Sequence, residues 1–268
     1  MRLAKPQLVE RTGRVIALAL LAAGLAGCQG IAGIQPMSQV RVIDVSPDAP
    51  ALDIYPGPPQ TTPAVLYNVG FGTVSSYISI PAGANTHAAT IAGTQQQLAT
   101  VRGNFLTGSQ YTVLAGNISA SLQMTVLKDQ SYPAPSGQVA LRFLDQATRA
   151  GTVDIYLVPP GSALARVAPI DTGLSFGSNT GYIDAPSGTY SIVVLPAGAV
   201  PSSAISPIYT GSRMSYPAGS ARTILLIDPA GPKYRYVSGR LEPLDTRAFD
   251  IPGSLARFDL DEIEKLLD

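Results

Sequence analysis

The feature that most constrains this chain is a stretch that occurs twice. Residues 41–59 (RVIDVSPDAPALDIYPGPP), shifted by 101 positions, align without a gap with residues 142–160 (RFLDQATRAGTVDIYLVPP). The positions that coincide are Arg41/Arg142, Asp44/Asp145, Asp53/Asp154, Ile54/Ile155, Tyr55/Tyr156, Pro58/Pro159 and Pro59/Pro160. Solenoid repeats have periods of roughly 20–50 residues, so this longer period predicts two tandem domains.

Later parts of the two copies also correspond, with an offset that grows along the chain. Phe71-Gly72 corresponds to Phe176-Gly177, residues 77–83 to residues 182–188, and Gly108-Ser109-x-x-Thr112 to Gly219-Ser220-x-x-Thr223. The growing offset places small insertions in loops of the second copy, where insertions cost little stability.

Short β-rich apolar runs, separated by turn residues, fill both copies. Their spacing of roughly 8–12 residues is typical of an all-β sandwich or barrel. We expect strands near residues 40–45, 52–55, 64–68, 74–80, 86–91, 97–102, 110–114 and 122–127, and then near 139–144, 153–158, 179–184, 189–195, 221–227 and 234–237. One cysteine excludes an internal disulfide, so each domain must be held together by its own core.

The first 28 residues have the organisation of an export signal. Four basic residues precede an apolar run over residues 15–26: Arg2, Lys5, Arg11 and Arg14. Such a run is too short to cross a bilayer as a helix, which takes about 20 residues, and is typical of a secretory signal peptide. The run ends in Leu25-Ala26-Gly27-Cys28, which resembles the lipobox of bacterial lipoproteins. We expect lipidation of Cys28 and membrane anchoring; a non-lipidated exported protein is the alternative.

The sequence after the cysteine predicts a location in the cell envelope. An aspartate directly after the cysteine would resemble an inner-membrane retention signal, but Gln29 stands there instead. The outer membrane is therefore favoured if the cell is Gram-negative. The expected organisation is a signal peptide (1–27), a lipidated tether (28–39), a first domain (40–130), a linker (131–137), a second domain (138–240) and an acidic tail (241–268). A formal net charge of zero gives no electrostatic basis for nucleic-acid binding.

The opening of the first copy resembles a bacterial envelope family known as domain of unknown function 4397. The residues that carry the resemblance are Val40-Arg41-Val42-x-x-x-Ser46-Pro47-Asp48-Ala49-Pro50-x-x-Asp53-Ile54-Tyr55, and Phe71-Gly72 with Tyr77-x-x-x-Pro81-x-Gly83 is similar to the family's middle. The resemblance covers residues 40 to about 128 and weakens in the second copy, where residues 146–149 (QATR) depart from it. It implies exported, often lipid-anchored β-sandwich modules of immunoglobulin-like or transthyretin-like type, and it implies no reaction.

Few residues offer catalytic or metal-binding chemistry. His87 is the only histidine, no G-x-S-x-G sequence accompanies it, and Tyr190 stands at the matching region of the second copy, so we expect a structural role. Asp44, Asp48 and Asp53 have spacings that match no calcium-binding loop. We expect these carboxylates to cap turns by accepting bonds from backbone N–H groups, and we expect no cofactor or metal.

Two groups of residues are candidates for binding. Tyrosines found only in the region of the second copy predict an exposed surface: Tyr209, Tyr216, Tyr234 and Tyr236. In the tail, Asp259 and Glu262 resemble a capping box, and an apolar stripe at helical spacing follows: Leu260, Ile263, Leu266 and Leu267. So short a helix must dock, either on the second domain or on a partner protein.

These observations favour a lipid-anchored envelope protein with a non-catalytic binding or scaffolding role. Its partners would be the membrane, through the lipid on Cys28, and an envelope protein or glycan. One alternative is an envelope hydrolase that uses Asp44 and Asp53, or their copies, as acid and base. Another is a secretion or assembly accessory that acts through residues 241–268.

Overall fold

The structure is a computed structural model that describes residues 35–202, 204–228, 234–237, 240–243 and 256–259. The described part consists of strands and two short 3-10 turns, Ser119–Ser121 (η2) and Leu164–Arg166 (η3). The predicted all-β sandwich fold is confirmed. Within the described residues, no helix is long and apolar enough to cross a membrane.

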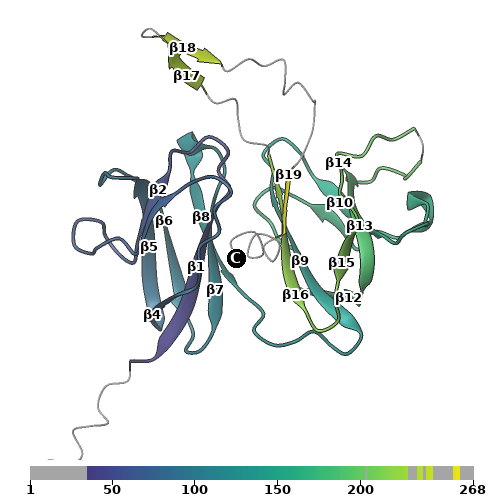
Figure 1. The fold of residues 1–268 in the computed structure, drawn as a ribbon, viewed down its shortest axis with the longest axis horizontal. Coiled ribbons are helices and arrows are strands. Elements are labelled where there is room, and N and C mark those ends of the chain that lie inside the picture. Colours follow the sequence, from purple (N-terminus) through teal and green to yellow (C-terminus); the bar gives the residue numbers. More distant parts are fainter. Residues whose placement is uncertain (1–34, 203, 229–233, 238–239, 244–255, 260–268) are drawn as a thin grey trace, which may run out of the picture. The chain divides into compact units, whose positions relative to one another are not determined.

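The first sandwich consists of two four-stranded sheets. Its strands are β1 (Met37–Asp44), β2 (Leu52–Tyr55), β3 (Leu66–Val69), β4 (Ile78–Pro81), β5 (Gly83–Ile91), β6 (Gln97–Phe105), β7 (Gln110–Gly116) and β8 (Gln123–Lys128). Sheet A has the order β4-β1-β7-β8 and sheet B the order β3-β2-β5-β6, as can be followed in Figure 1. The central β1–β7 pair is parallel, and all other pairs are antiparallel.

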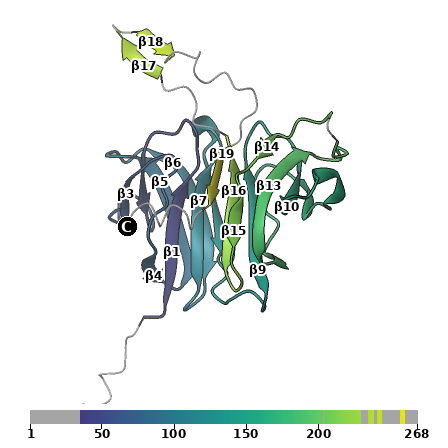
Figure 2. The same ribbon diagram turned by 45° about the vertical axis from the view of Figure 1, so that its right-hand side comes forward.

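The second sandwich repeats this topology. Its strands are β9 (Gln138–Gln146), β10 (Val153–Val158), β11 (Asp171–Leu174), β12 (Ile183–Pro186), β13 (Gly188–Pro196), β14 (Tyr209–Thr210), β15 (Met214–Tyr216), β16 (Ala221–Ile227) and β19 (Ala256–Asp259). Sheet C has the order β12-β9-β16-β19, whose strands are labelled in Figure 1. Sheet D has the order β11-β10-β13-β14, with β15 also paired to β13; Figure 2 labels β10, β13, β14 and β15. Again only the central pair, β9–β16, is parallel. A separate hairpin pairs β17 (Tyr234–Val237) with β18 (Arg240–Pro243).

Some elements differ from the prediction. The strand expected at residues 74–80 is shorter, since β4 begins at Ile78 and Val74 makes only an isolated bridge to Ile43. Strands β11, β14, β15, β18 and β19 were not expected. The acidic tail contributes β19, which pairs with β16 of the second sandwich. The predicted helix from residue 260 onward lies outside the described residues.

The two faces of β1 lie against different apolar clusters. Val40 and Val42 belong to the core between sheets A and B, whereas Ile43, next in the chain, belongs to a third apolar cluster. That cluster joins the outer faces of sheets A and C; it contains Ile43, Val45, Leu114, Leu127, Leu144, Leu225 and Ile227. Strands covered on both faces lose the alternation of polar and apolar residues, as parallel strands commonly do.

Candidate functional site

Several predicted site residues cannot be located. Cys28, Leu260, Ile263, Leu266 and Leu267 lie outside the described residues, so lipidation and tail docking stay predictions. Tyr234 and Tyr236 belong to β17, for which only the backbone is described.

The two remaining tyrosine candidates pack against the second core. Tyr216 is 0% exposed, and its ring centroid lies 6.2 Å from that of Tyr190. The expectation that Tyr216 lies on an exposed surface is therefore wrong: β15 pairs with β13 in a way that directs Tyr216 into the core. Tyr209 is partly buried and packs against the same cluster.

Asp44 and its counterpart Asp145 each stabilise a turn at the end of a strand. The Asp44 Oδ1 atom accepts the Ser46 N–H at 2.9 Å, and Asp145 Oδ1 accepts the Ala147 N–H at the same distance. Both side chains are fully buried, and neither Oδ2 has a hydrogen-bond partner within the described part of the chain. Burial raises the pKa of Asp44 to about 7 and that of Asp145 to about 6, although the turn hydrogen bond opposes the shift in each.

Asp53 joins β3 to the turn between β5 and β6 of sheet B. Its Oδ1 accepts the Asn68 N–H at 2.9 Å and its Oδ2 the Gly93 N–H at 2.8 Å. Asp154 makes the equivalent bonds, to Gly173 N at 2.9 Å and Gly198 N at 2.8 Å. Asp48 Oδ1 accepts a single bond of 2.7 Å, from Ser119 N. The turn-capping role expected for these aspartates is confirmed.

His87 lies in a packed environment. It is 1% exposed, and its ring meets Phe105 edge-to-face at a centroid distance of 5.2 Å. Neither ring nitrogen has a hydrogen-bond partner among the described residues. Burial lowers the pKa of His87 to about 4, so the imidazole is neutral at pH 7. This environment is the one expected for a structural histidine.

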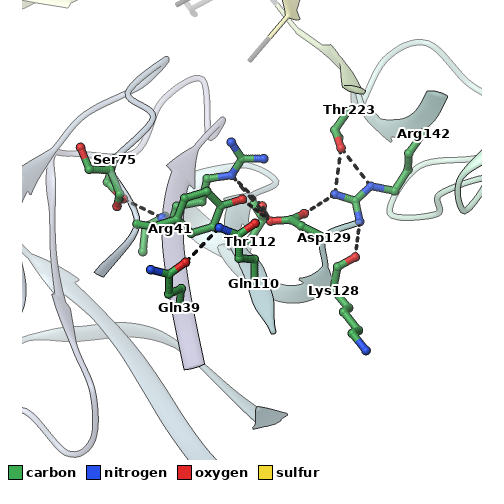
Figure 3. Close-up of polar contacts among 12 residues, drawn as sticks. Gln39, Arg41, Ser75, Gln110, Thr112, Lys128, Asp129, Arg142 and Thr223 are labelled. Carbon is green, nitrogen blue, oxygen red and sulfur yellow. Dashed lines mark hydrogen bonds and ion pairs between the residues drawn. The ribbon is translucent and has the colours of Figure 1, made fainter. Parts of the chain in front are cut away.

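A buried polar junction lies where the first sandwich ends, centred on Asp129 (Figure 3). Asp129 Oδ2 accepts bonds from Thr112 Oγ1 at 2.7 Å and from the Tyr77 hydroxyl at 2.8 Å. Arg41 Nε lies 3.7 Å from the same oxygen and donates to Thr112 Oγ1 at 3.0 Å. The Arg41 guanidinium also lies 5.0 Å from the centroid of the Tyr77 ring.

The second sandwich contributes the equivalent residues to the same junction. Arg142 Nη2 donates to Asp129 Oδ1 at 2.7 Å, and Nη1 donates to the Lys128 carbonyl at 2.9 Å. Arg142 also donates to Thr223 Oγ1 and lies 4.6 Å from the Tyr182 ring centroid. The junction is therefore the set Arg41, Tyr77, Thr112, Asp129, Arg142, Tyr182 and Thr223. Its paired members recur between the copies, which is the signal by which the sequence could have revealed it.

An open depression of about 670 Å³ lies on the first sandwich. It is lined by Asp53, Tyr55, Tyr67, Asn68, Ala92, Gly93, Thr94 and Gln95. Tyr67 is 68% exposed, whereas Tyr55 is partly buried. Tyr67 was not among the predicted binding residues, because the tyrosines predicted to bind were those found only in the region of the second copy.

Comparison with known proteins gives distant structural similarities. One is to the structure titled "The Bacillus anthracis TIE protein", with 12% sequence identity and a TM-score of 0.22. The similar region covers 70% of this chain and 33% of the other, so this chain spans about a third of that structure. Another is to the structure titled "Alpha-glucan binding by a streptococcal virulence factor", with 13% identity, a TM-score of 0.23, and coverage of 70% of this chain and 92% of that chain. No curated protein matches. Residues 38–156 match the family described as Domain of unknown function (DUF4397), which confirms the resemblance for the first copy and leaves most of the second copy outside the match.

Proposed function

We propose that this chain is a lipid-anchored cell-envelope protein with a non-catalytic binding or scaffolding role, in which the two sandwiches act as one rigid unit. The observation that carries the proposal is the polar junction, where Asp129 pairs with Arg142. The proposal adds to it the predicted lipid on Cys28 and a tether to residue 39.

The two sandwiches should stay together because separating them would expose apolar surface and a buried charge to water. The apolar cluster around Ile43, Leu114 and Leu225 would lose its cover, at roughly 25 cal/mol for each Å² of apolar surface. The buried Arg142 would lose its counter-charge, and breaking a buried pair costs about 3–5 kcal/mol. A unit held in this way suits the presentation of fixed surfaces near a membrane.

The environment of the polar residues supports a non-catalytic role. Asp53 and Asp154 use both carboxylate oxygens to hold backbone N–H groups. His87 is enclosed beside Phe105 and is not accessible to a substrate. These residues are explained by what they do for the fold.

Metabolic labelling with palmitate and membrane fractionation test the anchoring. We expect the wild-type chain to incorporate label and sediment with membranes, and Cys28→Ser to do neither, while Gln29→Ala behaves as wild type. An unlabelled, soluble wild-type chain would contradict the anchor. A hydrolytic activity of the purified protein that Asp53→Asn abolishes without unfolding the protein would contradict the non-catalytic role.

A further inference from the structure

The depression on the first sandwich is built on a fixed backbone. The two segments that surround it, β3 and the turn between β5 and β6, are joined through Asp53, whose carboxylate holds Asn68 N and Gly93 N at 2.9 and 2.8 Å. The Ala92 N–H also donates to the Ala51 carbonyl at 2.8 Å. Side chains on such segments are already placed before a ligand arrives, which reduces the entropy lost on binding.

The second sandwich keeps this support and changes the surface above it. There Asp154 accepts bonds from the Gly173 N–H in β11 and the Gly198 N–H in the turn after β13, which identifies the corresponding positions in the two copies. By this correspondence Thr172 stands in place of Tyr67, Ala199 in place of Thr94, and Val200 in place of Gln95. The fold therefore needs the aspartate and does not need the exposed tyrosine.

The second sandwich also covers the ring that the first leaves accessible. Tyr156, the counterpart of Tyr55, is 3% exposed, because Leu164, Val167 and Ala199 pack around it. In the first sandwich Tyr55 lines the open depression together with Tyr67. Two aromatic rings and an amide-rich rim thus occur together in one copy only.

The chemistry of the lining identifies a ligand class. Tyr67 exposes its aromatic ring to solvent, and Asn68 and Gln95 are exposed side chains that both donate and accept hydrogen bonds. The Thr94 hydroxyl donates to the Ile91 carbonyl at 2.9 Å and accepts from Gln96 N at 3.1 Å, so it keeps one acceptor position for a ligand hydroxyl. The lining contains no lysine or arginine, and its one carboxylate already accepts two backbone bonds. A sugar ring matches such a surface, because its apolar C–H face can stack on the tyrosine ring and its hydroxyl groups can hydrogen-bond the polar side chains.

We propose that this depression binds a sugar ring of a neutral polysaccharide, stacked on Tyr67 and hydrogen-bonded by Asn68, Thr94 and Gln95. The inference deepens the proposed binding role and rests on it. The depression is open, so it would hold part of a longer chain and leave the chain free to continue on either side.

Calorimetric titration of the full lipidated chain in detergent micelles tests the site. The probes are neutral hexasaccharides of glucose, mannose and N-acetylglucosamine. We expect at least one to bind, Tyr67→Ala to weaken its binding at least tenfold, and Tyr67→Phe to retain it, since phenylalanine keeps the ring face. Tyr132→Ala is the matched control, because Tyr132 is also 68% exposed but does not line the depression; it should bind as wild type.

Comparison of the two sandwiches suggests a second variant of Tyr67. Tyr67→Thr installs the residue that the second sandwich carries, so it should fold with an unchanged melting temperature and lose the binding. If none of the three probes binds, or if Tyr67→Ala and Tyr67→Thr bind as wild type, the sugar site is overturned. That result, with palmitate labelling and membrane association intact, leaves the proposed anchored role standing; loss of the anchoring would instead overturn the proposed function.

Discussion

Asp129 Oδ1 accepts a hydrogen bond of 2.7 Å from Arg142 Nη2, across the segment that joins the two sandwiches. Both side chains are buried, and the remaining polar atoms around them are engaged by Thr112, Tyr77 and Thr223. Burial, more than any neighbouring charge, raises the pKa of Tyr77, so its hydroxyl stays protonated and donates to Asp129. The Asp129 carboxylate thus contacts both Arg41 and Arg142, which occupy corresponding positions in the two copies.

Replacing Asp129 should destabilise the protein strongly. Asp129→Asn leaves Arg142 buried without a counter-charge, and we expect the free energy of unfolding to fall by about 3–5 kcal/mol, measured by urea denaturation. The control is Arg149→Ala, which removes a pair of 3.3 Å to Asp228 in which Arg149 is 70% exposed. Such a pair is worth at most about 1 kcal/mol, so equal losses in the two variants would contradict the role of the junction.

Asp44 should make the protein less stable as the pH rises. Burial raises its pKa in the folded chain from 3.8 to about 7, so its contribution is fully present below about pH 4 and is lost as the pH rises through 7. Asp44→Asn keeps an acceptor for Ser46 N and removes the charge. We expect the free energy of unfolding of this variant to match that of wild type at pH 4 and to exceed it at pH 8 by on the order of 4 kcal/mol.

Asp145 provides an internal comparison for that measurement. Its pKa is raised to about 6, so Asp145→Asn should show the same sign, a smaller gain and a transition at lower pH. Unfolding curves at pH 4, 6 and 8 check both variants. A stability difference from wild type that does not change between pH 4 and pH 8 would contradict the raised pKa values of these buried carboxylates.

Asp53 should be required to hold β3 and the turn between β5 and β6 in place. Asp53→Ala leaves the Asn68 and Gly93 N–H groups without their acceptor, and we expect a loss of about 1–3 kcal/mol in the free energy of unfolding. Asp154→Ala should cost a similar amount in the second sandwich. Asp48→Ala serves as the control, because it removes one hydrogen bond, to Ser119 N at an exposed position, and should cost less than about 1 kcal/mol.

His87 should make the protein sensitive to acid. Its pKa is lowered from 6.5 to about 4, so its contribution is complete above about pH 6.5 and is lost as the pH falls through 4. His87→Leu removes the titrating group and two buried nitrogens that have no hydrogen-bond partner in the described chain. Thermal unfolding at pH 4 and pH 7 should show a gain for the variant mainly at pH 4; an equal gain at both would contradict the titration.

Several strands were predicted with their observed bounds, and the two shortest strands were missed. Residues 52–55, 153–158 and 221–227 were predicted as they occur, because each is a β-rich run between turn residues. Strands β14 and β15 have only two and three residues, too few to show a period. Strand β19 lies in an acidic stretch and is held by β16, far away in the sequence.

The same reasoning explains the outcome for the candidate residues. Asp44 and Asp53 were found because they recur as Asp145 and Asp154 and because aspartate has one common role beside a turn. Tyr216 was placed wrongly, since a three-residue strand does not reveal which face is buried. Asp129 was missed because it was not one of the residues that correspond between the two copies. It contacts two residues that do correspond, Arg41 and Arg142.

The apolar cluster between the sandwiches draws on the same positions in both copies. Ile43 corresponds to Leu144 and Leu114 to Leu225, and all four belong to that cluster. Self-complementarity of this kind is the property of a twofold homodimer interface. A chain carrying one copy would expose this face to water and associate with a second molecule through it. Duplication within one chain replaces that bimolecular encounter by an intramolecular one, so that the pairing no longer depends on the concentration of the protein.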